Sequence, residues 1–223
     1  MKNSYAETHQ TTYRLRIMTC VAALAVAFTV SWPPPAHADD VTPPDIPDDI
    51  QVPVGNEPFL EGHAVGTQNY ICLPCPNATT AAAMCPDASG FAWTFFGPQA
   101  TLFDDYDGQV ITHFLSPNPD ESGTPRVTWQ HSQDTSTVWA VASASSTDPS
   151  FVEPGAIPWV LLRVVGAQDG PTGGDTLSET TFIQRLNTSK GVAPSTGCTQ
   201  SMDVGKRELV SYTADYFFYT QPK

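Results

Sequence analysis

The longest apolar run outside the N-terminal segment is residues 159–165, Trp-Val-Leu-Leu-Arg-Val-Val. It follows Pro154 and Pro158, which fix φ and lack a backbone donor, so a strand begins only at or after Trp159. A nearly continuous run of β-branched and bulky residues is typical of a strand that is covered on both faces. Arg163 interrupts the run and needs a partner or a place at the rim. The rest of the chain therefore has to supply shorter strands that pack around this one.

Short runs of similar character recur along the chain, and no stretch shows a sustained helical period with caps. Proline and glycine recur between the runs, as in β-sandwiches and barrels. Asp107-Gly108 indicates a hairpin, since this dipeptide suits the positive φ of a type I′ turn. The expected strands are residues 58–65, 67–73, 91–96, 101–103, 109–114, 126–131, 137–143, 159–165, 180–187 and 208–219. We expect an all-β fold, a mainly antiparallel sandwich or barrel with long loops that disulfide bonds staple together.

The first residues have the pattern of a secretory signal peptide. Basic residues precede the apolar region 17–30, and Ala36-His37-Ala38 supplies the small residues of a cleavage site. The apolar region is too short for a span of about 20 residues, so we expect no stable membrane anchor. We therefore assign residues 1–38 to a signal peptide, 39–53 to an acidic proline-rich arm and 54–223 to a single β domain. The protein is expected to be a secreted monomer, either extracellular or in the cell envelope.

The acidic charge restricts the partners of the protein. The formal net charge is −13, and loss of the basic leader makes the remaining chain more acidic still. Nucleic-acid binding needs Lys and Arg to neutralise phosphates, so we expect no nucleic-acid partner. Adhesion to anionic lipid is disfavoured for the same reason.

Four cysteines remain after the predicted leader: Cys72, Cys75, Cys85 and Cys198. An even number in an exported chain favours two disulfides, and three connectivities are possible. Cys72 and Cys75 have the C-x-x-C spacing of redox and zinc sites. However, zinc needs a second close ligand pair, and the neighbouring prolines indicate a loop rather than the helix of a thioredoxin motif. We therefore expect structural disulfides, no metal and no cofactor.

His113 is the first candidate for chemistry, as a base or a ligand with Asp104, Asp105 or Asp134 as its carboxylate partner. The alternative is a histidine hydrogen-bonded at a strand end. The turn that contains Asp104, Asp105 and Asp107 resembles a cation site, but the EF-hand pattern fails and a solvated acidic hairpin is the simpler interpretation. No serine lies in a G-x-S-x-G elbow.

Aromatic and basic residues supply candidates for binding. Trp129 and three further tryptophans at strand positions could form a sugar-stacking platform, although such residues are more often core. Arg185 lies in an apolar strand and either bridges to a carboxylate or contacts a ligand. We therefore count Trp129, Asp134 and Arg185 as candidate ligand-binding residues.

Several segments together resemble a family of secreted proteins of unknown function in bacteria and fungi. They include Gly66-Thr-Gln-Asn-Tyr-Ile-Cys72, Thr128-Trp-Gln130, residues 154–159, Ile183-Gln-Arg185 and the stretch that ends in Tyr212-Thr-Ala-Asp-Tyr216. Some fungal members carry the label malate dehydrogenase. We reject this label here because the chain has no dinucleotide fingerprint and no βαβ pattern.

The resemblance also suggests how the cysteines pair. Cys72 and Cys198 lie in family-like segments, whereas Cys75 and Cys85 lie in what resembles an insertion, which implies the bridges Cys72–Cys198 and Cys75–Cys85. No enzymatic signature emerges. The favoured hypothesis is a non-catalytic module that binds a glycan or protein partner outside the cytoplasm. The alternatives are a secreted hydrolase with a site near His113 and Asp104, and a passive envelope or matrix protein.

Overall fold

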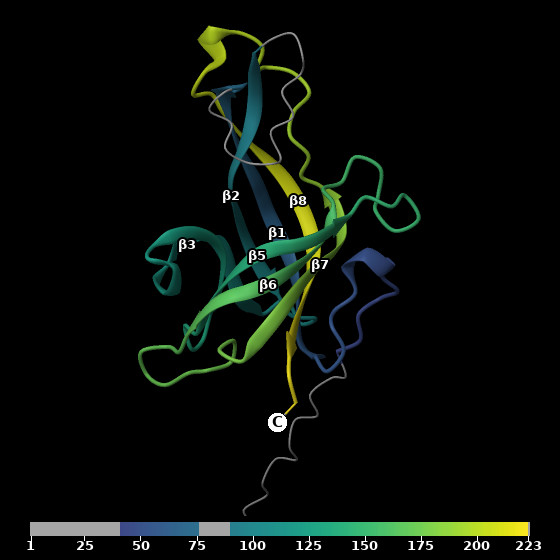
Figure 1. The fold of residues 1–223 in the computed structure, drawn as a ribbon, viewed down its shortest axis with the longest axis vertical. Helices are drawn as coiled ribbons and strands as arrows, with labels where there is room; N and C mark the ends of the chain where they lie inside the picture. Colours follow the sequence, from purple (N-terminus) through teal and green to yellow (C-terminus); the bar gives the residue numbers. More distant parts are fainter. Residues whose placement is uncertain (1–40, 76–89, 223) are drawn as a thin grey trace, which may run out of the picture. The chain divides into compact units, whose positions relative to one another are not determined.

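The computed structural model describes residues 41–75 and 90–222 (Figure 1). Nearly all regular structure in these residues is β-strand, with three short 3-10 helices. The elements in chain order are η1 (Asp48–Ile50), β1 (Glu57–Pro74), β2 (Phe91–Phe103), β3 (Gln109–Asn118), η3 (Pro119–Glu121), β4 (Thr124–His131), β5 (Thr137–Ser146), β6 (Trp159–Gln168), β7 (Thr180–Lys190), η4 (Ser201–Asp203) and β8 (Arg207–Thr220).

The strands form a closed barrel in which each strand pairs with its sequence neighbour and β8 returns to pair with β1. Every pairing is antiparallel. The expected all-β antiparallel fold is therefore confirmed, and of the two architectures it is the barrel. Closure pairs strands that would otherwise have free edges, which removes the template for edge-to-edge association.

Two predicted strand breaks lie inside continuous strands. Residues 58–65 and 67–73 belong to the single strand β1, and residues 91–96 and 101–103 belong to β2. The register of these two strands shifts beside Gly97, which has φ 139°, so the glycine marks a bulge rather than an end. The β2–β3 hairpin is present. A type I′ turn needs positive φ at both central residues, whereas here Asp107 has positive φ and Gly108 does not, so the turn is not type I′.

The barrel interior combines small residues on β1 with large aromatic residues on β8. Gly62 lies opposite Tyr216 and Gly66 lies opposite Tyr212 in the β1–β8 register. A Cβ atom on Gly66 would lie 2.2 Å from the carbonyl oxygen of Gln99, so only glycine fits the close approach of β1 and β2. The small residues on β1 leave space for the large aromatic side chains of β8 inside the barrel.

A second apolar cluster covers the outside of β6, β7 and β8. The arm that precedes β1 packs here through Ile50, which is fully buried, together with Trp159, Leu186 and Phe217. The Gln184 side chain donates from Nε2 to the Ile50 carbonyl at 2.8 Å and accepts a hydrogen bond from the Tyr219 hydroxyl. The arm is therefore fixed against the outer face of the barrel.

The predicted Cys72–Cys198 disulfide is present and joins β1 to the segment before β8. Around it, Tyr70 and Trp93 form a third buried cluster. Cys75 is also disulfide-bonded, but its predicted partner Cys85 lies outside the described residues, so that pairing stays a prediction. The predicted signal peptide lies outside them as well. No helix in residues 41–75 and 90–222 is long and apolar enough to cross a membrane.

Candidate functional site

Polar side chains meet inside the barrel, on the inward faces of five strands. We call this group the interior polar layer. Side chains alternate between the two faces of a strand, so each strand directs every second residue into the barrel. The layer consists of such inward residues from neighbouring and facing strands. Its members are Gln68, His113, Trp129, Arg185, Tyr212 and Tyr216.

The strand register decides which of these residues touch. His113 of β3 is directly opposite Trp129 of β4, and Arg185 of β7 is directly opposite Tyr216 of β8. The His113 ring stacks on Trp129 with the centroids 4.2 Å apart and contacts Tyr216 at 5.2 Å. The sequence-derived candidates His113, Trp129 and Arg185 thus share the interior polar layer.

His113 is neutral in this environment. Its Nδ1–H donates to the Thr128 carbonyl at 2.9 Å, which leaves the lone pair on Nε2. Burial lowers the pKa of His113 to about 3, and the nearby Arg185 charge acts in the same direction, although the Thr128 hydrogen bond opposes both. His113 therefore adds no positive charge to the layer at neutral pH.

The two tyrosines are also held in their neutral forms. The Tyr212 and Tyr216 hydroxyl oxygens lie 3.2 Å apart, and both side chains are about 1% exposed. Burial raises the pKa of each phenol well above its usual value, while Arg185 partly opposes this effect. Neither phenol therefore provides a negative charge for Arg185.

Arg185 brings a permanent positive charge into this neutral layer. Its Nη2 donates to the Pro158 carbonyl at 2.8 Å, and no carboxylate in the described parts of the chain forms an ion pair with it. Three buried N–H groups of the layer, Arg185 Nε, Gln68 Nε2 and Trp129 Nε1, make no hydrogen bond of good geometry within the described residues, although the Gln68 side chain lies against the Tyr212 hydroxyl and the Arg185 side chain against the Tyr216 hydroxyl. Buried donors are normally paired, so three such groups in one layer make it a candidate for binding an acceptor.

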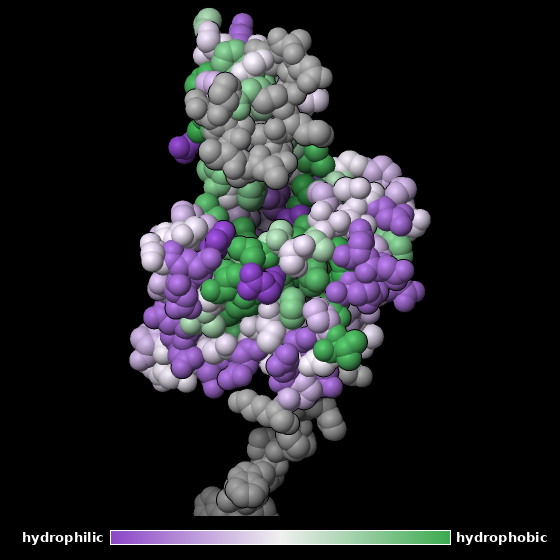
Figure 2. Space-filling view, in the orientation of Figure 1, coloured by the Kyte–Doolittle hydropathy of each residue, from purple (hydrophilic) through white to green (hydrophobic). Residues whose placement is uncertain are grey.

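The layer lies toward the barrel end at which β8 begins. Gln68 and Tyr212 occupy this side, beside Gly191, whereas Ile183 and Phe218 lie toward the opposite end, where β7 begins and β8 ends. Arg185 is only partly buried, so solvent reaches this depth of the barrel. Figure 2 shows hydrophilic residues at the floor of a hollow beside the upper parts of the long strands.

Asp104 and Asp134 lie elsewhere and hold turns together. Asp104 Oδ1 accepts hydrogen bonds from the backbone N–H groups of Tyr106 and Gly108 in the β2–β3 turn. Asp134 accepts from Ser136 and Thr176; these bonds outweigh the effect of burial and hold its pKa below the usual value. The structure therefore does not place either carboxylate beside His113, and the pairing expected for a hydrolase is not formed.

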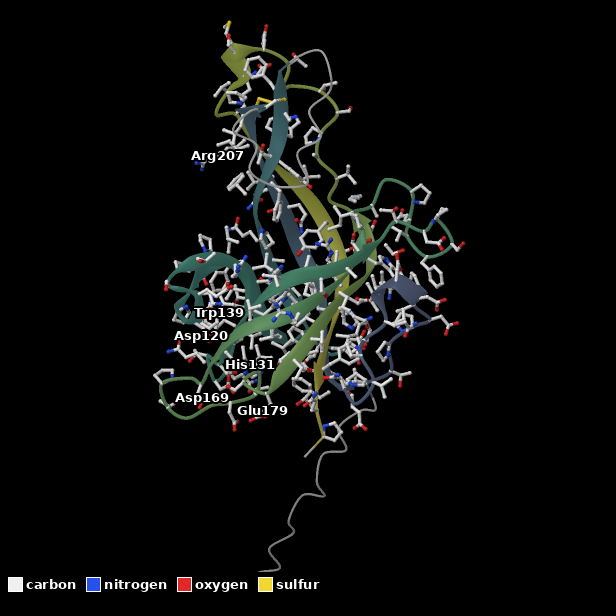
Figure 3. All side chains as sticks on the ribbon, in the orientation of Figure 1. Asp120, His131, Trp139, Asp169, Glu179 and Arg207 are labelled. Atoms are coloured by element: carbon white, nitrogen blue, oxygen red, sulfur yellow. A yellow bond between two sulfur atoms is a disulfide. The ribbon has the colours of Figure 1, made fainter. Side chains whose placement is uncertain are left out.

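The four tryptophans at strand positions do not form an exposed platform. The exposed fractions are 8% for Trp93, 1% for Trp129, 5% for Trp139 (labelled in Figure 3) and 4% for Trp159. A sugar ring needs an accessible indole face for stacking, so these residues act as core. Trp129 contributes to the candidate site through its free N–H and not through an open face.

Residues 53–220 match a family described as "Protein of unknown function (DUF3455)". The chain belongs to the DUF3455 family. The comparisons with curated proteins and with solved structures found no match. The resemblance to a family of unknown function is thereby confirmed. The malate dehydrogenase label gains no support, because the strands in residues 41–75 and 90–222 pair only in antiparallel fashion, where a dinucleotide fold needs parallel βαβ units.

A second group of ionisable residues lies on the outer face of the DUF3455 barrel. His63 donates from Nδ1 to Asp215 Oδ1 at 2.7 Å and from Nε2 to Asp105 Oδ1 at 3.0 Å. The Asp215 hydrogen bond, opposed by burial and aided by Asp105, raises the pKa of His63 to about 9. Burial raises the pKa of the adjacent Glu61. One ligand atom each from Glu61, His63 and Asp215 lies within 4.8 Å of the others.

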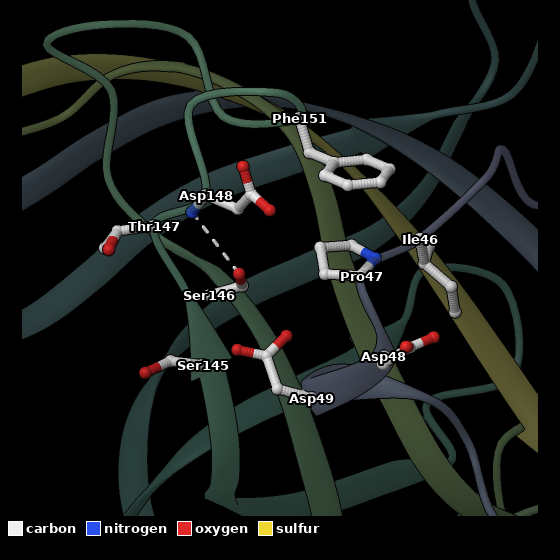
Figure 4. Close-up of a pocket in the computed structure, with 9 residues that line it drawn as sticks. All are labelled: Ile46, Pro47, Asp48, Asp49, Ser145, Ser146, Thr147, Asp148 and Phe151. Carbon is white, nitrogen blue, oxygen red and sulfur yellow. Dashed lines mark hydrogen bonds between the residues drawn. The ribbon is translucent and has the colours of Figure 1, made fainter.

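The arm also borders an acidic cleft of about 580 Å³. Its lining residues are Ile46, Pro47, Asp48, Asp49, Ser145, Ser146, Thr147, Asp148 and Phe151 (Figure 4). The Asp148 backbone N–H donates to Ser146 Oγ, and the Asp148 carboxylate accepts from the Ser150 N–H. These groups are already paired within their loop. The cleft therefore has weaker binding features than the interior polar layer.

Sequence reasoning missed Gln68, Tyr212 and Tyr216 as site residues. The two tyrosines are four residues apart on β8, so strand alternation predicts that they share a face. Alternation alone does not show which face of β8 points into the barrel. That is decided by the pairing of β8 with β1. The sequence does not indicate that His63 meets Asp215, because the two residues are distant in the chain and only the β1–β8 register brings them together.

Proposed function

We propose that this DUF3455 protein is a non-catalytic binding module that holds a small organic anion in the interior polar layer. Arg185 supplies the charge, and the free N–H groups of Gln68 and Trp129 supply directional hydrogen bonds to the same ligand. The single observation that carries the proposal is the presence of unpaired buried donors in the same layer as a cation that has no carboxylate partner among the described residues. A partly buried charge without a counter-charge loses part of its hydration, so an anion that enters the layer relieves a cost already present in the fold.

The size of the barrel sets the size of the ligand. An eight-stranded barrel leaves room for its own side chains or for one small ligand. The apolar and aromatic surroundings favour a carboxylate attached to a compact apolar body over a large polar glycan. The proposal keeps the binding-module hypothesis and replaces its glycan or protein partner with a small organic anion inside the barrel.

The test is a thermal-shift screen of the oxidised protein with succinate, benzoate, phosphate and sulfate, and with benzamide as the uncharged counterpart of benzoate. We expect a saturable rise in Tm with at least one of the two carboxylates and none with benzamide. A ligand at a hundredfold excess over its Kd stabilises the native state by about 2.7 kcal/mol.

Arg185→Gln should remove the shift, whereas Arg163→Gln should keep it, because Arg163 is exposed on the neighbouring strand β6. Should Arg185→Gln fail to fold, Gln68→Met removes one free donor at nearly constant volume and should weaken the shift. No response to any anion, or an equal response in Arg185→Gln, would overturn the proposal in favour of a protein partner or a passive structural role.

A further inference from the structure

We infer that Glu61, His63 and Asp215 form a binding site for one divalent transition metal ion on the outer face of the barrel. Glu61 and His63 are two residues apart on β1 and therefore point to the same side. Asp215 of β8 is directly opposite His63 in the register. The strands thus present one nitrogen and two carboxylate ligands to a common point, each within 4.8 Å of the others.

The spacing of these atoms is close to what an ion requires. Zinc binds imidazole nitrogen and carboxylate oxygen at about 2.0–2.2 Å, which puts tetrahedral ligands about 3.3 Å from one another. His63 Nδ1 and Asp215 Oδ1 lie 2.7 Å apart. Small side-chain rotations separate His63 Nδ1 from Asp215 Oδ1 and bring the Glu61 carboxylate closer, which makes room for the ion. The proton on His63 Nδ1 is released to solvent when the ion binds.

Both kinds of ligand already have the outer partners that a metal site needs. A metal-bound histidine normally donates its second ring N–H to a carboxylate, which fixes the orientation of the ring. With the ion at Nδ1, His63 Nε2–H donates to Asp105 Oδ1 at 3.0 Å. Asp215 is oriented in the same way, because its Oδ2 accepts from Asn187 Nδ2 at 2.8 Å while Oδ1 faces His63.

The surroundings favour a transition metal over calcium. Calcium takes six to eight oxygen ligands, whereas this group offers a nitrogen and only two strand-bound carboxylates. The side chains are partly shielded, with 40% of His63 and 23% of Asp215 exposed. Three protein ligands with one side open to solvent leave a fourth position for water.

The experiment is equilibrium dialysis of EDTA-stripped, untagged protein against Zn²⁺, with the bound metal counted per chain and Tm measured in parallel. We expect one Zn²⁺ to bind at this site and raise Tm, and His63→Gln and Glu61→Gln to abolish this binding. Asp105→Asn should weaken affinity about 10- to 100-fold, the usual cost of losing an outer-shell partner.

Glu57→Gln is the matched control, since Glu57 is an exposed glutamate at the start of the same strand and should leave zinc binding unchanged. Arg185→Gln should also bind zinc normally, which separates this site from the anion site. The inference is overturned if no zinc binds, if His63→Gln binds as much as the unmodified protein, or if Ca²⁺ and not Zn²⁺ raises Tm.

Discussion

His113 makes the stability of this barrel dependent on pH in the mildly acidic range. The ring is fully enclosed between Trp129 and Tyr216, and its pKa in the folded protein is lowered to about 3. In the unfolded chain the pKa returns to about 6.5. Between these values the unfolded state binds a proton that the folded state does not. Stability is therefore unaffected above pH 6.5 and falls as the pH decreases toward 3.

The magnitude follows from the two pKa values. Each pH unit in this window corresponds to about 1.4 kcal/mol for one proton, and the contribution between pH 7.5 and pH 5 is about 2 kcal/mol. His113→Asn removes the titrating ring and keeps a side-chain N–H that can reach the Thr128 carbonyl. The unmodified protein should therefore lose about 2 kcal/mol more than His113→Asn over this interval.

The assay is urea denaturation of both proteins at pH 7.5 and at pH 5, in EDTA and without added organic anions. His63, whose pKa is raised to about 9, titrates in both proteins, so its contribution cancels in the difference. Asp134 and Asp203 have lowered pKa values and lose their contributions mainly below pH 5. Equal losses in the two proteins would refute the assignment of His113 as a buried neutral ring.

Two further predictions concern the Cys72–Cys198 disulfide and the arm that packs on the outer face of the barrel. Replacing Cys72 and Cys198 with alanine should lower the free energy of unfolding by about 5 kcal/mol in the chain-entropy model, since the bridge spans 126 residues; a loss below about 1 kcal/mol in denaturant unfolding would contradict this. Ile50→Ala should cost about 2–5 kcal/mol and make the arm sensitive to limited proteolysis, whereas Val54→Ala, at an exposed position, should change neither measurement.

The sequence predicts the strands of this protein better than their ends. Residues 159–165 were expected to be covered on both faces, and β6 is indeed buried by the barrel interior on one side and by the arm cluster on the other. The breaks expected near Gly66 and Gly97 are absent, and β1 and β2 continue through these glycines. Here Gly66 permits close approach and Gly97 lies at a bulge, and neither role is visible before the pairing is known.

The sequence does not reveal the strand pairing, so it could not predict which candidate residues meet. His113, Trp129 and Arg185 were each identified as candidates from residue type and position. Their convergence depends on closure, because Tyr216 of the last strand is directly opposite Arg185 and contacts both His113 and Trp129. The carboxylate partners expected for His113 were chosen by proximity in sequence. In the structure Asp104 and Asp134 bond instead to backbone groups of nearby turns and loops, a common use of aspartate.

The adjacent polar residues Gln184 and Arg185 lie on opposite faces of β7 and differ in their hydrogen bonding. Successive residues on a strand point to opposite faces, so Gln184 is directed outward and Arg185 inward. Gln184 is fully buried and satisfied, because it bonds to Ile50 of the arm and to Tyr219. Arg185, one residue later, keeps a free Nε–H and no carboxylate among the described residues. The same strand thus completes its hydrogen bonds toward the arm and leaves them incomplete toward the interior, which is why we place the ligand inside the barrel.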